Sequence, residues 1–525
     1  MAKKPKKKAK KPSKKKAAKK PAKKAAKKPA KKAVKKKVKK VARKPARKPA
    51  KKAKPVKKAV KKPAKKAKPV KKMAKKAAKK GKPKKPAKAK PAKKPVKAAP
   101  KAVKLAAKPA VPEKVTVSVR AKMPCTKAAA LVNEIHKYIV PSTHPYPLVI
   151  KGGNGCYLQD IDGNWFLDFS SQVASTPLGC GHPAVKEAIA RVMEQGMHKI
   201  AGQDFYCEEH YELARKLVQI TPKHLSKVFL SNTGAEAVEN ALKFAYRKMG
   251  PLLGISCIGA FHGRTLGALS FTYSKDIQKT NYPQLRYRRI PFCTSDTEAA
   301  VQDVHSVVDR DTTAFIIAEC IQGEGGYRIA SQTFMKTLEQ AARSNNVALI
   351  IDEVQSGMGR TGKWWSFEHY GIKPDIVSAG KSLQVGATIS SEEWAIKEPG
   401  AVSSTWGGGG RIDMAVGLEV IKAIEKGKLL LNATKMGKYT LDRLREFENF
   451  PGVMGYDGLG LMLRVDFKDK DRRNAVLSNC FKKGLVLLGC GNESVRILPP
   501  MTVGKEEIDQ GLNILEQVIR EGKKR

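Results

Sequence analysis

From residue 227 onward, runs of apolar residues alternate with stretches in which apolar positions recur every three or four residues. The runs predict buried strands, and the recurring positions predict amphipathic helices. A strand is predicted at 227–232 ("KVFLSN"), followed by a helix at 235–250 with Val238, Ala241, Leu242 and Ala245 on its apolar face. Further strands are predicted at 313–320 ("TAFIIAEC"), 347–354 ("VALIIDEV") and 375–380 ("DIVSAG"), and a helix at 331–346. This alternation predicts an α/β fold with a mostly parallel sheet covered by helices.

The pattern changes after about residue 411. A helix is predicted at 412–427, and short strands punctuated by glycine follow it. The last helix, at 505–525, carries one apolar stripe made of Ile508, Leu512, Leu515, Val518 and Ile519. These elements predict a second, smaller α+β domain.

Residues 1–110 show neither the apolar runs of strands nor the three-to-four-residue spacing of helices. They hold most of the chain's net charge of +61. They contain 54 Lys and Arg and no Asp or Glu, which leaves 52 basic and 45 acidic residues, a net +7, for the rest. Dense like charge and frequent proline, as in "KKPAKKAAKKPAKKAVKKKVKK", predict a disordered segment without a core. One interpretation is a solvated tail with no specific partner. The other is salt-sensitive, sequence-independent binding of DNA or RNA, and in composition the segment resembles the tails of linker histones.

The remainder of the chain contains no run near the roughly 18 apolar residues that a membrane span needs. Its nine cysteines are scattered without a C-x-x-C pair, so neither a disulfide framework nor a zinc or other metal site is predicted. We expect a cytoplasmic protein without a membrane partner, associated with a nucleoid or chromatin if the tail binds nucleic acid.

Three predicted strands end on residues of distinct chemistry, and the carboxyl ends of parallel strands are where ligands gather. Ser231 to Ala235 form a small-residue turn that opens a helix, which is a seat for a phosphate. Asp352 ends an apolar strand, and a buried carboxylate needs a cationic partner. Lys381 follows another strand, where burial would lower the pKa of its amine. Each signal alone is weak, because such residues are more often exposed or structural, but together they suit pyridoxal 5′-phosphate (PLP).

Five segments in order resemble the class III aminotransferases: "SNTGAEAVENALKFA", "FHGRTLGALSFT", "AECIQGEGG", "LIIDEVQSGMGRTGKWWSFEHYGIKPDIVSAGK" and "SSTWGG". The resemblance spans nearly all of 140–525. It implies the type I fold of PLP-dependent transferases and a homodimer or dimer of dimers with interfacial sites. The domains expected are the tail at 1–110, an N-terminal part of the small domain at 111–170, a large PLP-binding domain at 171–415 and the C-terminal small domain at 416–525.

The resemblance also implies roles for individual residues. Lys381 would form the imine with the cofactor and then move the proton, and Asp352 would hold the ring nitrogen protonated. Gln355 would bind the phenolic oxygen, and Phe261 would stack on the ring. The whole cofactor-binding set is Thr233, Gly234, Ala235, Phe261, His262, Asp352, Gln355, Lys381 and Thr405, the last reaching the phosphate from a partner subunit.

The substrates implied are an ω-amino acid, such as lysine, ornithine, acetylornithine or 4-aminobutyrate, and 2-oxoglutarate. Arg264 would bind the donor's carboxylate and Arg496 the α-carboxylate of glutamate, with Glu324 masking Arg496 and Glu319 as a second active-site glutamate. Cys320, the loop at 382–387 and residues 408–411 depart from the usual family pattern. The loop at 382–387 and residues 405–408 look more like the lysine 6-aminotransferase branch, but the donor stays open. Two alternatives also stay open: a nucleic-acid-compacting protein with a non-catalytic core, and a PLP-dependent racemase.

Overall fold

The computed structural model describes residues 118–140, 143, 146–296, 304–404, 408 and 410–522. The predicted tail at 1–110 and Thr405 lie outside the described residues. Within the described part, no helix is long and apolar enough to cross a membrane.

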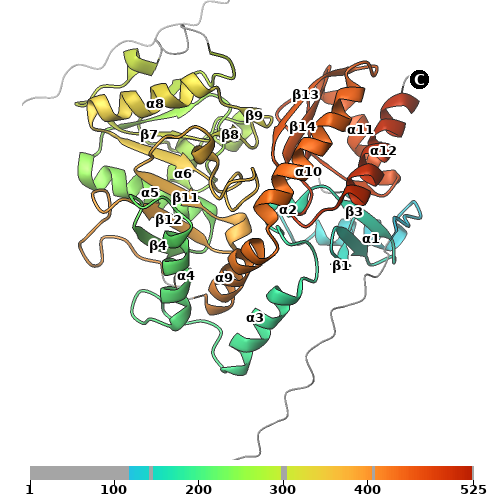
Figure 1. The fold of residues 1–525 in the computed structure, drawn as a ribbon, viewed down its shortest axis with the longest axis horizontal. Helices are drawn as coiled ribbons and strands as arrows, with labels where there is room; N and C mark the ends of the chain where they lie inside the picture. Colours follow the sequence, from blue (N-terminus) through green and yellow to red (C-terminus); the bar gives the residue numbers. More distant parts are fainter. Residues whose placement is uncertain are drawn as a thin grey trace, which may run out of the picture. The chain divides into compact units, whose positions relative to one another are not determined.

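The centre of the large lobe is a seven-stranded sheet with the strand order β4-β12-β11-β10-β7-β5-β6 (Figure 1). Its strands are β4 (Lys227–Ser231), β5 (Leu253–Cys257), β6 (Tyr287–Ile290), β7 (Thr313–Ala318), β10 (Ala348–Asp352), β11 (Ile376–Ala379) and β12 (Gly386–Ser390). Only β12 runs antiparallel to its neighbours. The prediction of a mostly parallel sheet is therefore confirmed.

Helices cover both faces of this sheet, as expected for strands that are apolar on both sides. On one face, α5 (Gly234–Met249) packs its Val238, Ala241, Leu242 and Ala245 against Phe315, Ile350 and Ile376. On the other face, α8 (Gln332–Asn345) buries Phe334, Leu338 and Ala342 against a cluster that includes Ile351 and Val377. The helix and strand positions predicted from periodicity thus match the observed ones to within two residues at most ends.

The smaller lobe contains an antiparallel sheet with the order β13-β14-β17-β16. Its strands are β13 (Val453–Leu459), β14 (Met462–Phe467), β16 (Leu488–Cys490) and β17 (Ser494–Ile497), and its helices are α10 (Leu429–Leu444), α11 (Lys470–Lys482) and α12 (Lys505–Glu521). The stripe predicted for α12 is buried in full. A third sheet joins β1 (Ile150–Asn154), β2 (Tyr157–Asp160) and β3 (Trp165–Asp168) to β15 (Leu485–Val486), so an early and a late segment of the chain pair directly.

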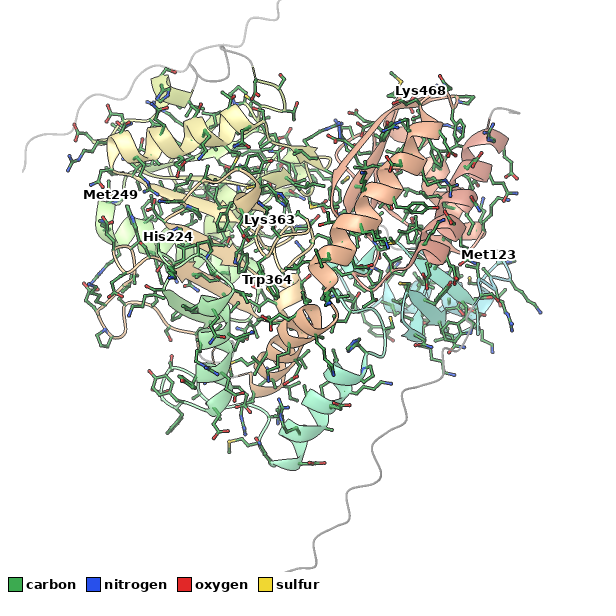
Figure 2. All side chains as sticks on the ribbon, viewed as in Figure 1. Met123, His224, Met249, Lys363, Trp364 and Lys468 are labelled. Carbon is green, nitrogen blue, oxygen red and sulfur yellow. The ribbon has the colours of Figure 1, made fainter. Side chains whose placement is uncertain are left out.

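The remaining elements connect these sheets. They are α1 (Thr126–Ile135), α2 (Ser171–Ala174), α3 (Pro183–Glu194), α4 (Glu208–Gln219), α6 (Leu266–Ser270), α9 (Arg411–Lys426), the short strands β8 (Ile321–Gln322) and β9 (Arg328–Ile329), and the 3₁₀ turns η1 (Asp276–Gln278), η2 (Ser366–His369), η3 (Lys381–Leu383) and η4 (Arg445–Phe447). Figure 2 shows Lys363 and Trp364 in the loop after β10, and this loop leads to the buried Trp365.

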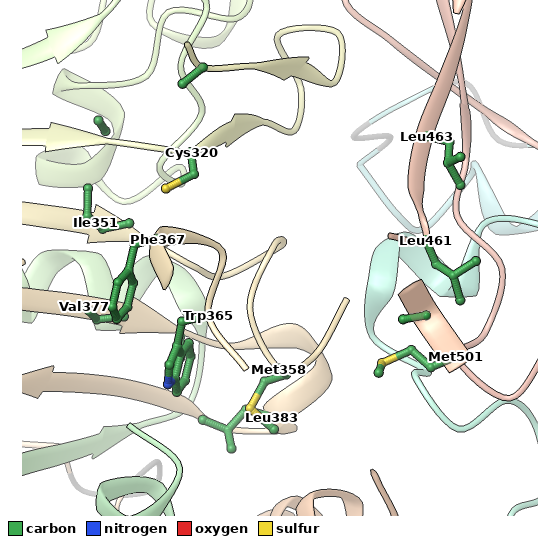
Figure 3. Close-up of a cluster of buried hydrophobic side chains, with 14 of the residues drawn as sticks. Cys320, Ile351, Met358, Trp365, Phe367, Val377, Leu383, Leu461, Leu463 and Met501 are labelled. Carbon is green, nitrogen blue, oxygen red and sulfur yellow. The ribbon is translucent and has the colours of Figure 1, made fainter. Parts of the chain in front are cut away.

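One hydrophobic cluster continues from the large sheet into the smaller lobe (Figure 3). On the large-sheet side it contains Ile351, Phe367 and Val377, and on the other side Leu463 and Met501. Since the two lobes share this apolar core, they form a continuous support for the residues between them.

Candidate active site

A cavity of about 320 Å³ lies at the carboxyl ends of β4, β10 and β11. It is lined by Gly234, Ala235, Phe261, His262, Gly263, Arg264, Glu319, Glu324, Asp352, Val354, Gln355 and Lys381. Ten of these twelve residues belong to the set singled out from the sequence. The other two, Gly263 and Val354, sit beside predicted residues and carry no chemistry that a sequence pattern could reveal.

Lys381 follows β11 after a single glycine and begins η3. The glycine allows a close approach, because a Cβ at Gly380 would lie 3.0 Å from the Cα of Gly234, which is tighter than an ordinary contact. The lysine itself has a positive φ of 47°, which is rare for a residue with a side chain. Burial lowers the pKa of its amine, while the carboxylates of Asp352 and Glu324 act in the opposite direction. The neutral, nucleophilic form of the amine is thus more favoured in this site than it would be in bulk water.

Asp352 ends β10, and both of its carboxylate oxygens are held. Oδ2 lies 2.8 Å from Nδ1 of His262, and Oδ1 accepts hydrogen bonds from the N–H of Val354 at 3.0 Å and the hydroxyl of Ser378 at 3.3 Å. The backbone N–H of His262 donates in turn to Thr272. These contacts fix the orientation of a buried carboxylate that faces the same cavity as Lys381. The sequence placed His262 in the site but gave no indication of this pairing.

The turn before α5 exposes backbone donors to the cavity. Thr233 caps the helix, since its hydroxyl accepts from the N–H of Glu236 at 3.2 Å, and Glu236 accepts from the N–H groups of Asn232 and Thr233. The first turn of a helix has further N–H groups without helical partners, and here those of Gly234 and Ala235 belong to cavity-lining residues. Thr233 shapes this turn but does not line the cavity.

Gln355 and Glu319 approach the cavity from two loops. The Oε1 atom of Gln355 is buried and has no partner within the described chain. Glu319 accepts from the N–H groups of Gly323 at 2.9 Å and Phe261 at 3.0 Å, so it holds the loop that presents the Phe261 ring. Burial, opposed by His262 and reinforced by the charge of Asp352, raises the pKa of Glu319 to about 7.

Arg496 lies on β17 beside Glu324 and outside the lining of the cavity. Its Nη2 atom is 2.8 Å from Oε1 of Glu324 and also donates to the carbonyl of Gly489 at 2.9 Å. Burial alone would raise the pKa of Glu324, but Arg496 holds it below its usual value. Nε and Nη1 of Arg496 are buried and without partners among the described residues. Arg496 is 4% exposed, and its guanidinium retains unused donors for a second carboxylate.

The cavity and its neighbours fit PLP on observations independent of any resemblance. An amine with a lowered pKa, a fixed carboxylate, an unpartnered amide oxygen and two helix-start N–H groups surround one enclosure, and they match the aldehyde, ring nitrogen, phenolic oxygen and phosphate of that molecule. Neither of the other two cavities of the described residues combines such groups with a lysine whose pKa is lowered.

Comparisons with known proteins agree with this chemistry. Residues 138–519 match the model of the family described as aminotransferase class-III. Acetylornithine aminotransferase from Archaeoglobus fulgidus is 34% identical over 72% of this chain and 97% of its own length, and that from Methanopyrus kandleri is 35% identical over 74% and 98%.

Solved structures extend the likeness to the fold. Lysine aminotransferase from M. tuberculosis in the internal aldimine form superposes with a TM-score of 0.69 at 28% identity, covering 74% of this chain and 99% of that one. Ornithine aminotransferase from Toxoplasma gondii gives a TM-score of 0.70 at 27% identity, covering 76% and 96%.

Proposed function

Since the chain belongs to the class III aminotransferases and is a PLP-dependent transaminase, we propose that it moves the terminal amino group of an ω-amino acid to 2-oxoglutarate. The donor is lysine, ornithine, acetylornithine or 4-aminobutyrate. Relatives named acetylornithine, lysine and ornithine aminotransferases support this class of donor.

PLP, when bound, supplies the electron sink that transamination requires. Lys381 is the amine that would hold it and afterwards move the proton at the reacting carbon, because it lines the cavity and the pKa of its amine is lowered. Asp352 would hold a proton on the ring nitrogen, since its carboxylate is fixed by His262 and Val354. Gln355 would hold the phenolic oxygen, and the N–H groups of Gly234 and Ala235 would receive the phosphate.

The ion pair between Glu324 and Arg496 is the observation that carries the proposal. The two half-reactions have different needs: a donor that reacts at its terminal amine brings no carboxylate next to the reacting carbon, whereas glutamate does. Arg496 must therefore be neutralised in one half-reaction and available in the other. The 2.8 Å pair with Glu324, together with two unused donors on the same guanidinium, provides both states.

Arg264 completes the recognition at the far end of the substrate. It lines the cavity of Lys381, it is exposed, and no ion pair joins it to an acid among the described residues. Its guanidinium is therefore available to a carboxylate remote from the reacting carbon. This position suits the carboxylate of an ω-amino donor and the γ-carboxylate of 2-oxoglutarate.

The proposal is tested by incubating the full-length holoenzyme with each donor and 2-oxoglutarate and measuring glutamate. We expect one donor to exceed the others in kcat/KM and Glu324→Gln to alter the two half-reactions unequally, slowing the donor half more than the glutamate half. Conversion of an L-amino acid to its D form without glutamate would identify a racemase instead. Absence of both reactions would leave only a non-catalytic core.

We also propose that the active unit is a homodimer or a dimer of dimers, with Thr405 of one copy completing the phosphate site of the other. Exposed Met193, Met197, Phe205, Tyr206 and Tyr211 on and between α3 and α4 support an interface on this part of the surface. Sedimentation equilibrium on the holoenzyme tests the assembly, and a monomer that is fully active would contradict it.

A second proposal concerns residues 1–110, whose 54 basic and zero acidic residues favour non-specific binding of DNA or RNA. The remainder of the chain, with a net charge of +7, is much less suited to this role. The corresponding test compares DNA retention by full-length protein and by protein lacking the segment.

A further inference from the structure

Glu324 lies in the turn of a short hairpin made of β8 and β9. The two strands pair at only two positions and form a sheet of their own. A two-stranded hairpin is at best marginally stable by itself. The position of Glu324 therefore depends on contacts between this hairpin, residues 321–329, and the rest of the enzyme.

Several of these contacts are made by neutral groups. The side-chain amide of Gln322 donates to the carbonyl of Ile258 at 2.7 Å, and the N–H of Gly491 donates to the carbonyl of Glu324 at 2.8 Å. Tyr327 is buried in a hydrophobic cluster that includes residues of β14 and β16. The hairpin contains two charged residues, Glu324 at the turn and Arg328 on β9, and the second supplies contacts of another kind.

Arg328 joins the hairpin to the smaller lobe through two carboxylates (Figure 1). Its Nη1 atom lies 2.7 Å from Oδ2 of Asp466 on β14, and its Nη2 atom lies 2.8 Å from Oε1 of Glu493. The side chains of Arg328 and Asp466 are 26% and 11% exposed, so this pair is largely sheltered from solvent. Charge-assisted hydrogen bonds are roughly twice as strong as neutral ones. Arg328 is therefore a stronger anchor of the hairpin than its neutral hydrogen bonds.

The strand that receives this anchor is the strand of Arg496. The hydroxyl of Ser494 donates to Asp466 at 2.5 Å, and Nη2 of Arg328 lies 3.5 Å from the same hydroxyl. Ser494 begins β17, and Arg496 is two residues further along, so their side chains lie on the same face. The two charged residues of the hairpin thus meet neighbouring positions of one strand, Arg328 beside Ser494 and Glu324 beside Arg496.

We propose that Arg328 is a positioning residue for the ion pair between Glu324 and Arg496. It holds the base of the hairpin against β14 and β17, so that Glu324 reaches Arg496 whenever no substrate carboxylate occupies that guanidinium. Arg328 does not line the cavity of Lys381, so it acts through Glu324. This inference rests on the proposed ω-aminotransferase function and adds a residue that controls the exchange between its two half-reactions.

The test measures the affinity of glutarate by calorimetry on the full-length holoenzyme. Glutarate carries the two carboxylates of 2-oxoglutarate and lacks the keto group, so it does not react. A carboxylate that binds Arg496 has to displace Glu324. We expect Glu324→Gln to tighten glutarate binding by about 10-fold and Arg328→Gln by at least about 4-fold, because the competing carboxylate is removed in the first variant and less well placed in the second.

The double variant Arg328→Gln/Glu324→Gln separates positioning from a general structural role. If Arg328 acts through Glu324, the double variant should bind glutarate within about 2-fold of Glu324→Gln alone. A merely structural role predicts weaker binding in Arg328→Gln, with or without Glu324, because a distorted site loses contacts. Arg328→Lys should lie between wild type and Arg328→Gln, since an ammonium does not reproduce the two-pronged contact of a guanidinium.

Arg443→Gln is the matched control. Arg443 of α10 pairs with Asp509 of α12 in the same lobe, its side chain is 21% exposed, and no hydrogen bond or ion pair joins it to the hairpin among the described residues. Its glutarate affinity should stay within about 2-fold of wild type. Asp466→Asn keeps the shape of the acid and removes its charge, so it should tighten glutarate as Arg328→Gln does. This variant decides the question if Arg328→Gln fails to fold by circular dichroism.

Unchanged or weaker glutarate binding in folded Arg328→Gln, or a double variant that binds more than about 4-fold tighter than Glu324→Gln, overturns the assignment. Turnover is assayed separately. Failure of every ω-amino donor to yield glutamate, with the pattern of glutarate affinities intact, would overturn the transfer reaction and leave the role of Arg328 standing.

Discussion

At the residue scale, Lys381 combines a position in the wall of the cavity with an unusual backbone conformation. Its φ of 47° places a long side chain in the left-handed region, which costs on the order of 1 kcal/mol and persists where the surroundings enforce it. Two contacts enforce this conformation. Gly380 packs against Gly234, and the hydroxyl of Ser382 donates a hydrogen bond to the carbonyl of Ala174 at 2.6 Å. The amine is thereby held in the cavity and not released to solvent.

We predict that purified protein is yellow and that Lys381→Ala loses this absorbance and reduces glutamate formation by at least about 1,000-fold. The neutral fraction of the amine rises with pH. Because burial lowers the pKa of this amine, its neutral fraction reaches its maximum at a lower pH than that of an ordinary lysine. The rate of cofactor uptake by apoenzyme, followed by visible absorbance from pH 6 to 11, should therefore plateau early. Lys397→Ala, whose side chain is 71% exposed, serves as the control. A rate that still climbs above pH 10.5 would contradict the lowered pKa.

Glu353, the neighbour of Asp352, gives a prediction for stability. Its carboxyl group is fully buried and accepts hydrogen bonds from Ser356, Ser366 and the N–H of Phe367. Burial, partly offset by these hydrogen bonds, raises its pKa from 4.5 to about 7. Between these two values the unfolded chain releases a proton that the folded chain keeps, so this group makes stability fall as pH rises.

Glu353→Gln abolishes that titration. We predict that the melting temperature of the variant, relative to wild type, increases by a few degrees, roughly 2–6 °C, between pH 5 and pH 8. Differential scanning calorimetry at both values is the measurement. A difference between variant and wild type that is the same at pH 5 and pH 8 would show that Glu353 titrates normally.

Two buried arginines, Arg496 and Arg473, show what sequence could and could not predict. Arg496 lies in the short segment "VRILPP", which matches the family, so a role for it was predicted, although its burial and its hydrogen bond to Gly489 were not. Arg473 lies in "KDKDRRNAV", which has the composition of an exposed helix surface. It is buried by tertiary packing of α11, whose neighbours include β16 and β17. No local pattern distinguishes it from Arg472.

At the element scale, long amphipathic helices and apolar strands were predicted well because periodicity reports burial directly. The apolar faces of α5 and α12 are buried as expected. The strand β12 was not predicted, because "GATIS" is short and pairing between strands distant in sequence has no local signal. The left-handed turn at Ser171–Ala174 was likewise unforeseen, since four successive residues with positive φ and none of them glycine follow no propensity rule.

The packing of α10 against the turn between β13 and β14 supports a prediction at this scale. A Cβ at Gly437 of α10 would lie 2.1 Å from the carbonyl oxygen of Gly460, which is backbone and has little freedom to move. Alanine favours a helix by about 1 kcal/mol over glycine, but the clash should outweigh this gain. We predict that Gly437→Ala lowers the free energy of unfolding by about 1–3 kcal/mol, measured by urea denaturation.

Gly455→Ala in β13 is the control for this experiment, since its Cβ would meet no atom within 4 Å. Its free energy of unfolding should stay within about 0.5 kcal/mol of wild type. If Gly437→Ala were as stable as this control, α10 would lie farther from the turn than the structure places it.

At the scale of the whole molecule, the enzyme fold was recognisable because several long motifs occur in order, whereas composition alone indicated only a globular protein. Pairing of β3 with β15 joins residues near the start and the end of the described chain, and this explains why residues before 170 support a lobe built largely from the last hundred. Sequence patterns located both segments, but only the sheet register shows that they meet.

The division of charge between residues 1–110 and the remainder leads to the last prediction. If the basic segment binds polyanions, the full-length protein should be retained by double-stranded DNA at low salt and released as salt rises, because binding exchanges counterions for lysine. Protein that begins at residue 111 has a net charge of +7 and should lose most of this retention while keeping its kcat for glutamate formation. Gel retardation between 50 and 300 mM NaCl measures the first effect, and the glutamate assay measures the second. Because the slope of affinity against salt counts neutralised phosphates, a steep slope in the full-length protein and a shallow one after deletion would assign the binding to the segment. Equal retention of both proteins would place the binding in the folded enzyme and refute a nucleic-acid role for the first 110 residues.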